Sequence, residues 1–273
     1  MSNLIEVRDA AFAYHGIEYV WENVNLEVKQ GDSVCILGAN GCGKTTLFNC
    51  IAGNLALTRG RVMINGKAIE EYSITELAKN IGIVYQEHSV SFPYTSLEVV
   101  RMGRTPYLGM FQTPGRADTE MAYAIMEEMG IAQLAECPYS RISGGQRQLV
   151  LIARTLCQNP KAILLDEPTS HLDFKNQALV MKTLHSLSEK GITILMTSHS
   201  PSHAWKTSNK TVLMGERGII AQGTPQQVMT SANLEKTYDV KVNIYHSNGD
   251  GKAFFCKPAF EEVEFMDRRN GEK

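Results

Sequence analysis

The chain has 273 residues, of which 43% are hydrophobic, enough for a substantial core in one large or two modest domains. Its 27 basic residues stand against 29 acidic ones, and the net charge of −2 excludes the basic field that drives nonspecific nucleic-acid binding. There is no apolar run of the roughly 18 to 20 residues that a spanning helix needs, no basic-then-apolar export signal and no Cys-x-x-Cys pair among six cysteines. We therefore expect a soluble chain in a reducing cytosol.

The predicted elements begin with short alternating strands in residues 1–31, which would form an antiparallel β layer. A buried strand over 33–37 then leads into a glycine-rich stretch and a helix over 44–52. Further strands are predicted at 61–64, 81–85, 162–165, 192–196, 211–214 and 219–221. Between Gln86 and Pro160 the pattern is mainly helical, most clearly at 119–129 and 146–157, and another helix is expected at 175–189.

These elements predict an α/β fold with a mixed sheet core, an N-terminal antiparallel layer and an inserted α-helical subdomain. We expect a single domain over residues 1–260. The predicted parts are a sheet core at about 1–86 and 160–238, a helical subdomain at about 87–159 and a short extension at 239–260. Residues 261–273 carry eight charged groups in 13 positions, which predicts a frayed tail.

The stretch Gly38–Thr46 has the spacing of a phosphate-binding loop: glycine, four residues, glycine, lysine and threonine. Glycines let backbone amides turn inward, and these amides and the positive end of the next helix would cradle phosphates. Lys44 would reach the outer phosphates and the Thr45 hydroxyl would bind Mg²⁺. The alternative is a chance glycine-rich turn. The expected nucleotide contacts in this loop are Gly38, Asn40, Gly41, Cys42, Gly43, Lys44, Thr45 and Thr46.

Two later motifs complete a nucleotide site. Asp166 ends an apolar strand, where its carboxylate can face a cation, and Glu167 beside it can reach an attacking water. A strand-end acidic pair without such duties is the alternative. Ser143, Gly144, Gly145 and Gln146 form a glycine-rich turn that suits a second nucleotide contact, although such turns also cap helices. Together the motifs predict an ATP-driven protein.

With these motifs, the chain resembles the ATP-binding-cassette (ABC) family of P-loop NTPases from about Leu4 to Tyr238. The stretch from Ser143 to Gln146 is similar to the family signature, although Ile142 stands where leucine is usual. The resemblance implies that this signature contacts the nucleotide of a second subunit. It therefore implies a homodimer that closes around two ATP molecules with Mg²⁺ and opens after hydrolysis.

The resemblance also implies roles for two loop residues. Gln86 matches the glutamine-loop position, which touches Mg²⁺ or the lytic water and senses a membrane partner, whereas a solvated loop glutamine is the alternative. Asp173 matches an aspartate loop that crosses between subunits, with His171 in place of the commonest alanine. Asp173 would equally suit the N-cap of the next helix.

Two further contacts to ATP are implied. His199 matches the switch histidine that contacts the γ-phosphate, against a plain loop histidine as the alternative. Tyr14 matches the aromatic residue that stacks on adenine, with Phe12 as its local rival and a core aromatic as the alternative. Cys42 lies near a helix start, where a lowered thiol pKa is one hypothesis and the filling of a small-residue position is the other.

A stand-alone cassette of this size resembles the ATPase subunit of an importer. The stretches 100–109, 168–173 and 223–238 are similar to those of ferric-siderophore, haem and cobalamin importer ATPases and their molybdate-type relatives. This implies two transmembrane permease subunits, an indirect link to a substrate-binding protein and a place on the cytoplasmic face of the membrane. Apolar residues in 102–110 would suit docking of a permease helix, or would form a partly buried loop.

Two other classes remain open from the sequence. One is a cytosolic ABC ATPase that acts on nucleic acid, and the other is a nucleotide-dependent scaffold that does not hydrolyse ATP. Glu167 argues against the scaffold because such a protein needs no base. We expect no nucleic-acid partner, given the net charge.

Overall fold

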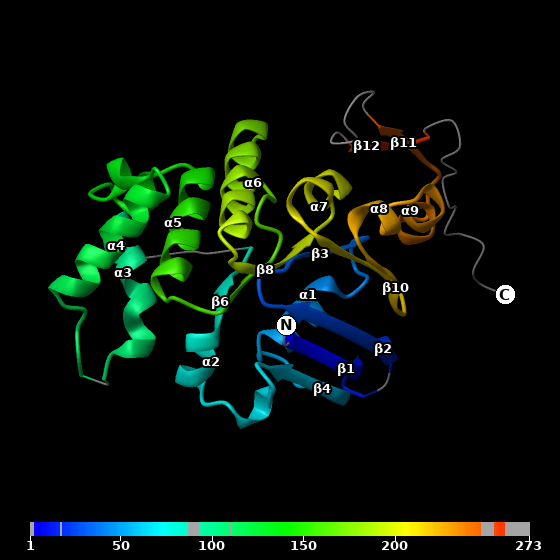
Figure 1. The fold of residues 1–273 in the computed structure, drawn as a ribbon, viewed down its shortest axis with the longest axis horizontal. Coiled ribbons are helices and arrows are strands. Elements are labelled where there is room, and N and C mark those ends of the chain that lie inside the picture. The colour runs from blue at the N-terminus through cyan, green and yellow to red at the C-terminus, as the bar shows by residue number, and fades with distance from the viewer. Residues whose placement is uncertain (1–2, 17, 87–92, 110, 247–253, 260–273) are drawn as a thin grey trace.

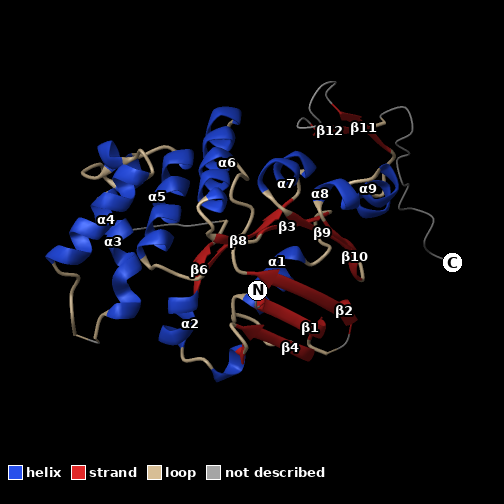
Figure 2. Cartoon of the chain, viewed as in Figure 1, coloured by secondary structure: helices blue, strands red, loops and turns tan. Residues whose placement is uncertain are grey.

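The computed structural model describes residues 3–16, 18–86, 93–109, 111–246 and 254–259, and Figure 1 shows their arrangement. Within these ranges the strands form a six-stranded sheet, a four-stranded sheet and a two-stranded hairpin. Figure 2 shows helices on both sides of the six-stranded sheet and a group of helices beyond its β6 edge. The predicted α/β fold with a mixed sheet, an N-terminal antiparallel sheet and a helical subdomain is confirmed.

The N-terminal sheet is antiparallel, with the strand order β2-β1-β4-β5. Its strands are β1 (Asn3–Tyr14), β2 (Glu18–Lys29), β4 (Arg59–Ile64) and β5 (Lys67–Ala68). The prediction of short strands in residues 1–31 was wrong, because β1 and β2 each run for 12 residues. The register between them shifts from Val7 to Ala10, and Asp9 there has a φ of 46°. This bulge interrupts the alternation from which strand length was inferred.

The central sheet has the order β10-β9-β3-β8-β7-β6, and all its strands are parallel except the edge strand β10. Its strands are β3 (Ser33–Gly38), β6 (Ile81–Val84), β7 (Ala162–Leu165), β8 (Thr193–Ser198), β9 (Lys210–Gly215) and β10 (Gly218–Gly223). The predicted strands are confirmed. Since β3, β7 and β8 are neighbours and parallel, the residues that follow them meet at one edge of the sheet.

The helices connect and cover these strands. They are α1 (Lys44–Ile51), α2 (Ile74–Asn80), α3 (Ser96–Arg101), α4 (Arg116–Glu128), α5 (Gly144–Cys157), α6 (Phe174–Glu189), α7 (Pro201–Thr207), α8 (Pro225–Val228) and α9 (Ser231–Tyr238). Short 3₁₀ turns are η1 (Ile69–Glu71), η2 (Met102–Tyr107), η3 (Ala132–Leu134) and η4 (Tyr139–Arg141). The predicted helices near 44–52, 119–129, 146–157 and 175–189 are confirmed as α1, α4, α5 and α6.

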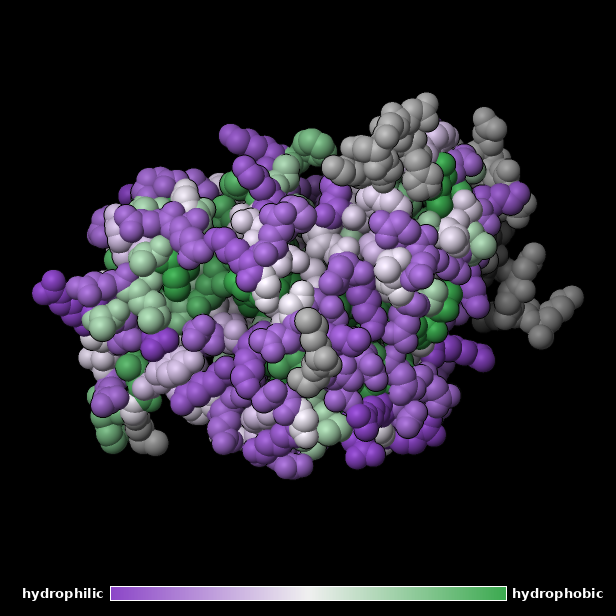
Figure 3. Space-filling model, viewed as in Figure 1, coloured by the Kyte–Doolittle hydropathy of each residue, from purple (hydrophilic) through white to green (hydrophobic). Residues whose placement is uncertain are grey.

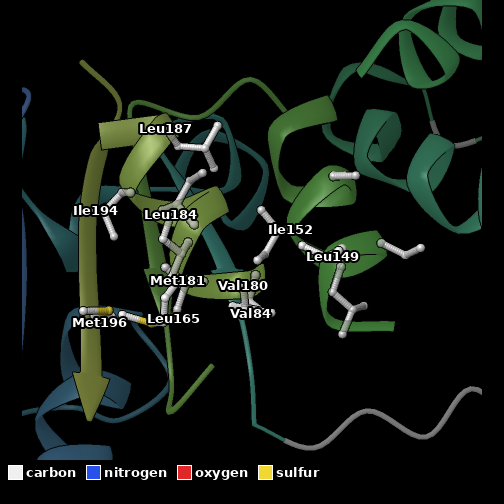
Figure 4. Close-up of a cluster of buried hydrophobic side chains, with 14 of the residues drawn as sticks. Val84, Leu149, Ile152, Leu165, Val180, Met181, Leu184, Leu187, Ile194 and Met196 are labelled. Atoms are coloured by element: carbon white, nitrogen blue, oxygen red, sulfur yellow. The ribbon is translucent and has the colours of Figure 1, made fainter. Parts of the chain in front are cut away.

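One buried cluster joins the helices to the central sheet. Figure 4 shows α6 side chains, among them Leu184, lying between Ile194 of β8 and Ile152 of α5. A second cluster fills the space between the N-terminal sheet, α1 and the central sheet. Because interiors pack at the density of organic crystals, the first cluster fixes where α5 stands relative to β7 and β8.

The C-terminal part adds the hairpin β11 (Val242–His246) and β12 (Phe254–Pro258) beside α7 and α9 (Figure 1). The Phe254 ring stacks on that of Trp205 in α7, with centroids 4.6 Å apart. The predicted tail 261–273 lies outside the described residues, and the domain boundaries stay predictions. None of the helices in the described ranges combines the length and apolarity needed to cross a bilayer.

Candidate functional site

The phosphate loop connects β3 to α1. Gly41 and Gly43 have φ values of 84° and 92°, which side chains rarely adopt, so the loop needs glycine at both positions. A Cβ on Gly43 would also lie 2.6 Å from Cδ1 of Trp21. No side chain caps the start of α1, and its first turn holds no acidic residue. The first amide groups of α1 are therefore available to an anion.

Lys44 is buried at the head of α1 and lies across this loop. Its Nζ donates hydrogen bonds of 2.9 Å to the carbonyl oxygens of Gly38 and Ala39. The same Nζ lies 3.9 Å from Oε1 of Glu167. The ammonium group therefore stands between the loop and the acid that follows β7, where the outer phosphates of a nucleotide would add further negative charge.

Asp166 and Glu167 follow β7 and are oriented by one hydroxyl group. Thr197 Oγ1 donates to Oδ1 of Asp166 at 2.6 Å and accepts from the backbone N–H of Glu167 at 2.9 Å. Burial raises the pKa of the Asp166 carboxyl, and hydrogen bonds from Thr197 and Thr45 oppose that rise. Sequence reasoning missed Thr197, although its place at the end of β8, beside β7, was the available signal.

His199 lies beside the same acid. Its Nδ1 is 3.2 Å from Oε2 of Glu167, within hydrogen-bonding distance. Glu167 has a φ of 43°, an uncommon conformation for a residue other than glycine, and its carboxylate lies near both Lys44 and His199. The structure thus brings Lys44, Glu167 and His199 together from three different elements.

Lys44 and Glu167 border a pocket of about 310 Å³. Its lining consists of Tyr14, Val20, Asn40, Gly41, Gly43, Lys44, Thr45, Thr46 and Glu167. Tyr14 is 53% exposed and lines the pocket, whereas its rival Phe12 is 5% exposed. The exposed ring is the one that a base can stack on. A larger groove of about 550 Å³ lies between α4 and α6 and is mainly apolar (Figure 3). No residue of the phosphate loop lines it.

Cys42 does not have the lowered thiol pKa that its place near a helix start had indicated. Burial raises the pKa of this thiol, and the charge of Lys44 only partly opposes the rise. The side chain is buried, and its Sγ would lie 2.5 Å from a Cβ on Gly38. The structure therefore favours the alternative, in which Cys42 fills a small-residue position.

The signature turn forms the start of α5. Ser143 Oγ accepts from the backbone N–H of Gln146 at 3.3 Å, and Gln146 Oε1 accepts from that of Ser143 at 2.9 Å, a capping box. A Cβ on Gly145 would lie 2.3 Å from Asn176 Cγ, whereas Gly144 is exposed. None of these signature residues lines the 310 Å³ pocket as the described residues form it.

Gln86 and Asp173 lie apart from the pocket lining. Nε2 of the exposed Gln86 is 3.4 Å from Nε2 of His171, a contact that sequence reasoning did not anticipate. Asp173 caps α6, because its Oδ1 accepts from the backbone N–H of Asn176 at 2.8 Å. The capping alternative for Asp173 is thus observed.

The donor atoms near the pocket suit a hard cation. The Thr45 hydroxyl is near enough to the Asp166 carboxyl to lower its pKa, so both groups can face one ion. In the described part of the chain no three His, Cys, Asp or Glu residues cluster into a metal site. Two protein oxygens with further ligands from phosphate and water are the arrangement that Mg²⁺ favours, and the residues present fit it.

Comparisons with known proteins agree with this geometry. A family model for ABC transporters matches residues 21–170. The iron(3+)-hydroxamate import ATP-binding protein FhuC of Bacillus subtilis (strain 168) is 34% identical over 231 residues, 84% of this chain and 86% of that protein. A solved inward-facing ABC transporter, proposed to be of metal-chelate type, gives a TM-score of 0.81 at 30% identity, and the match covers 93% of this chain and 96% of that chain. A solved dimeric ATP-binding cassette bound to ADP and Pi gives a TM-score of 0.70 at 29% identity, and the match covers 81% of this chain and 98% of that chain.

Proposed function

The chain belongs to the ABC transporter family and is an ATPase subunit of such a transporter, and we propose that it drives import of a metal-chelate cargo. One observation carries the chemistry. The phosphate loop, Lys44 and Glu167 border one pocket, with Asp166 and His199 in hydrogen-bonding contact with the same group of residues.

In this proposal the pocket binds ATP through its phosphates. The amides of the loop from Gly38 to Gly43 and the head of α1 surround the β-phosphate, while Lys44 exchanges its two carbonyl partners for phosphate oxygens. Tyr14 stacks on the adenine. Thr45 and Asp166 would hold Mg²⁺, and Gln86 would reach the cation or the lytic water. The cation would neutralise charge on the β- and γ-phosphates.

Hydrolysis would use Glu167 as the general base. Its carboxylate accepts a proton from the attacking water, the new bond forms at the γ-phosphorus, and the bond to the ADP oxygen breaks. His199 donates a hydrogen bond to the γ-phosphate. Because Nδ1 of His199 is already 3.2 Å from Oε2 of Glu167, the base and the phosphate ligand would be oriented together.

The signature supports a homodimer. Ser143 and Gly144 are exposed and do not line the pocket that the described residues of their own chain form. A hydroxyl and helix-start amides that face outward suit the γ-phosphate bound by a second copy. Asp173 lies close to this turn through Asn176, so it would meet the second copy at the same seam.

A permease would dock beside Gln86. Tyr107 at the end of η2 is 40% exposed and Phe111 after it is 95% exposed, so apolar surface faces outward there. Gly103 is buried, and a Cβ on it would lie 2.1 Å from Arg154 O, so Phe111 is the better position for a crosslink. Two permease subunits would hold two cassettes at the cytoplasmic face, with a substrate-binding protein on the other side.

The cargo class comes from the relatives, since the proposed cargo path lies in other subunits. Ferric hydroxamate import by FhuC and the metal-chelate type of the solved transporter support a ferric siderophore, haem, cobalamin or a similar chelate. The net charge of −2 argues against a nucleic-acid partner.

The test is reconstitution. The tagged chain would be purified from its own cells with the membrane proteins that accompany it and placed in liposomes. We expect a ferric chelate with its binding protein to stimulate ATP hydrolysis, and the same complex carrying Glu167→Gln to stay inactive. Stimulation by DNA instead, with no membrane partner, would overturn the importer function while leaving the ATPase intact.

A further inference from the structure

Tyr238, the last residue of α9, touches the turn that carries His199. Its hydroxyl group donates a hydrogen bond to the backbone carbonyl oxygen of His199, with the two oxygens 3.2 Å apart. The ring packs against the larger buried cluster, so its position is fixed by the core. Burial raises the pKa of the Tyr238 hydroxyl, which therefore remains a donor throughout the physiological range.

The turn after β8 has few other restraints. The N-cap residue Ser200 makes no side-chain cap to α7, and Pro201 contributes no backbone donor at the first helical position. The backbone N–H of Ser200 donates to Ser198 Oγ at 3.0 Å. The His199 side chain itself is 55% exposed, so packing alone does not hold it toward Glu167. The backbone carbonyl that Tyr238 binds is therefore a principal anchor of the imidazole.

The C-terminal segment is built to bring Tyr238 to this turn. On α9, Leu234 and Thr237 are buried and seat the helix, and Asp239 ends it with a φ of 53°. The chain then enters the hairpin, where the Phe254 ring stacks on Trp205 at an interplanar angle of 17°. The segment thus contacts α7 through β12 and, through Tyr238, the turn that precedes α7 (Figure 1).

We propose that Tyr238 is a positioning residue for hydrolysis, which ties the C-terminal segment to the His199 turn and holds the imidazole beside Glu167. This role rests on the proposed ATPase function and deepens it. Through Tyr238, movement of the C-terminal segment would be transmitted to the residue that contacts the γ-phosphate. Tyr238 does not line the 310 Å³ pocket that the described residues form.

The test compares two hydroxyl deletions in the full chain. Tyr238→Phe removes the bond to His199, and Tyr72→Phe removes a chemically matched bond, since Tyr72 donates to the Ile64 carbonyl at 2.7 Å far from the pocket. Loss of one hydrogen bond of ordinary strength should lower kcat of Tyr238→Phe by about two- to tenfold and leave KM for ATP unchanged. Tyr72→Phe should leave kcat unchanged.

A second measurement separates positioning from loss of stability. In protein with ¹³C-labelled histidines, the His199 ring signal is the one of seven that His199→Ala removes. Tyr238→Phe should shift that signal and Tyr72→Phe should not. An unshifted His199 signal with an unchanged kcat for Tyr238→Phe would overturn the proposal. A wild-type chain that binds ATP but never hydrolyses it would instead overturn the proposed function.

Discussion

Replacing Glu167 with glutamine tests the central assignment, because the change removes a base but little volume. The backbone N–H of Glu167 remains bound to Thr197 Oγ1 at 2.9 Å, so the turn with its φ of 43° should persist. A positioned general base contributes a factor of about 10² to 10⁴, equivalent to about 3–5 kcal/mol of barrier. We expect turnover to fall by that factor.

The same substitution should strengthen ATP binding. Glu167 Oε1 lies 3.9 Å from Lys44 Nζ, a separation that bounds their attraction at about 4 kcal/mol for an effective dielectric of about 20. Solvent screening and the two carbonyl partners of Lys44 reduce this to about 1 kcal/mol, or roughly a fivefold gain in affinity once the competing carboxylate is neutral. ATP should then accumulate in a closed dimer.

The assay measures phosphate release in a single turnover, equilibrium ATP binding and the oligomeric state by size exclusion. The matched control is Glu120→Gln, which removes the same formal charge from an exposed ion pair with Arg116. Wild-type phosphate release by Glu167→Gln would refute the assignment of the base. An equal loss in Glu120→Gln would show that the effect is not specific to the pocket.

Four further predictions concern the same site. Asp166→Asn should abolish Mg²⁺-dependent turnover. Burial raises the pKa of the Asp166 carboxyl, so ionisation of this group lowers the stability of the fold at neutral pH. Asp166→Asn should therefore have a higher melting temperature than the wild type at neutral pH. The difference should disappear in acid, where the wild-type carboxyl is protonated. Gly145→Ala places a Cβ 2.3 Å from Asn176 Cγ and should cost about 1–3 kcal/mol in denaturant unfolding and prevent ATP-dependent dimerisation. Tyr14→Ala should weaken equilibrium ATP binding by about two- to tenfold while Tyr14→Phe retains it. Ser143→Ala should lower the free energy of unfolding by about 1 kcal/mol, whereas Ser143→Asp should keep the cap and still lose turnover, since it repels the γ-phosphate.

The fold was predictable where a short segment is buried on every side. The apolar runs 33–37 and 162–165 are bounded by turns, and both are buried strands in the structure. The length of the first strands was not predictable, because the bulge at Asp9 reverses which face of the sheet the later side chains in the alternating pattern occupy. A pattern of period two cannot distinguish a bulge from the end of a strand.

The site was predictable where its chemistry depends on neighbouring residues in the chain. The phosphate-binding role predicted for Gly38 to Thr46 depends on a fixed spacing, and the structure folds that stretch as the end of β3, a loop and the start of α1. Contacts made by tertiary packing left no such pattern. The Thr197 hydroxyl, the contact of His171 with Gln86 and the rise in the Cys42 pKa all depend on elements distant in sequence or on burial.

Capping and nucleotide binding are compatible at the signature turn, which is why the local alternatives for these residues could not be ranked from sequence. In capping α5, Ser143 Oγ accepts a hydrogen bond from the backbone N–H of Gln146, and its own O–H could still donate to a phosphate of the second copy in the proposed dimer. Asp173 Oδ1 and Oδ2 each accept one bond from Asn176 and retain a further lone pair. A capping residue is rigid, and rigidity lowers the ordering cost of closing the dimer on ATP. In the proposed dimer, the cap would therefore be a precondition for the contact between subunits.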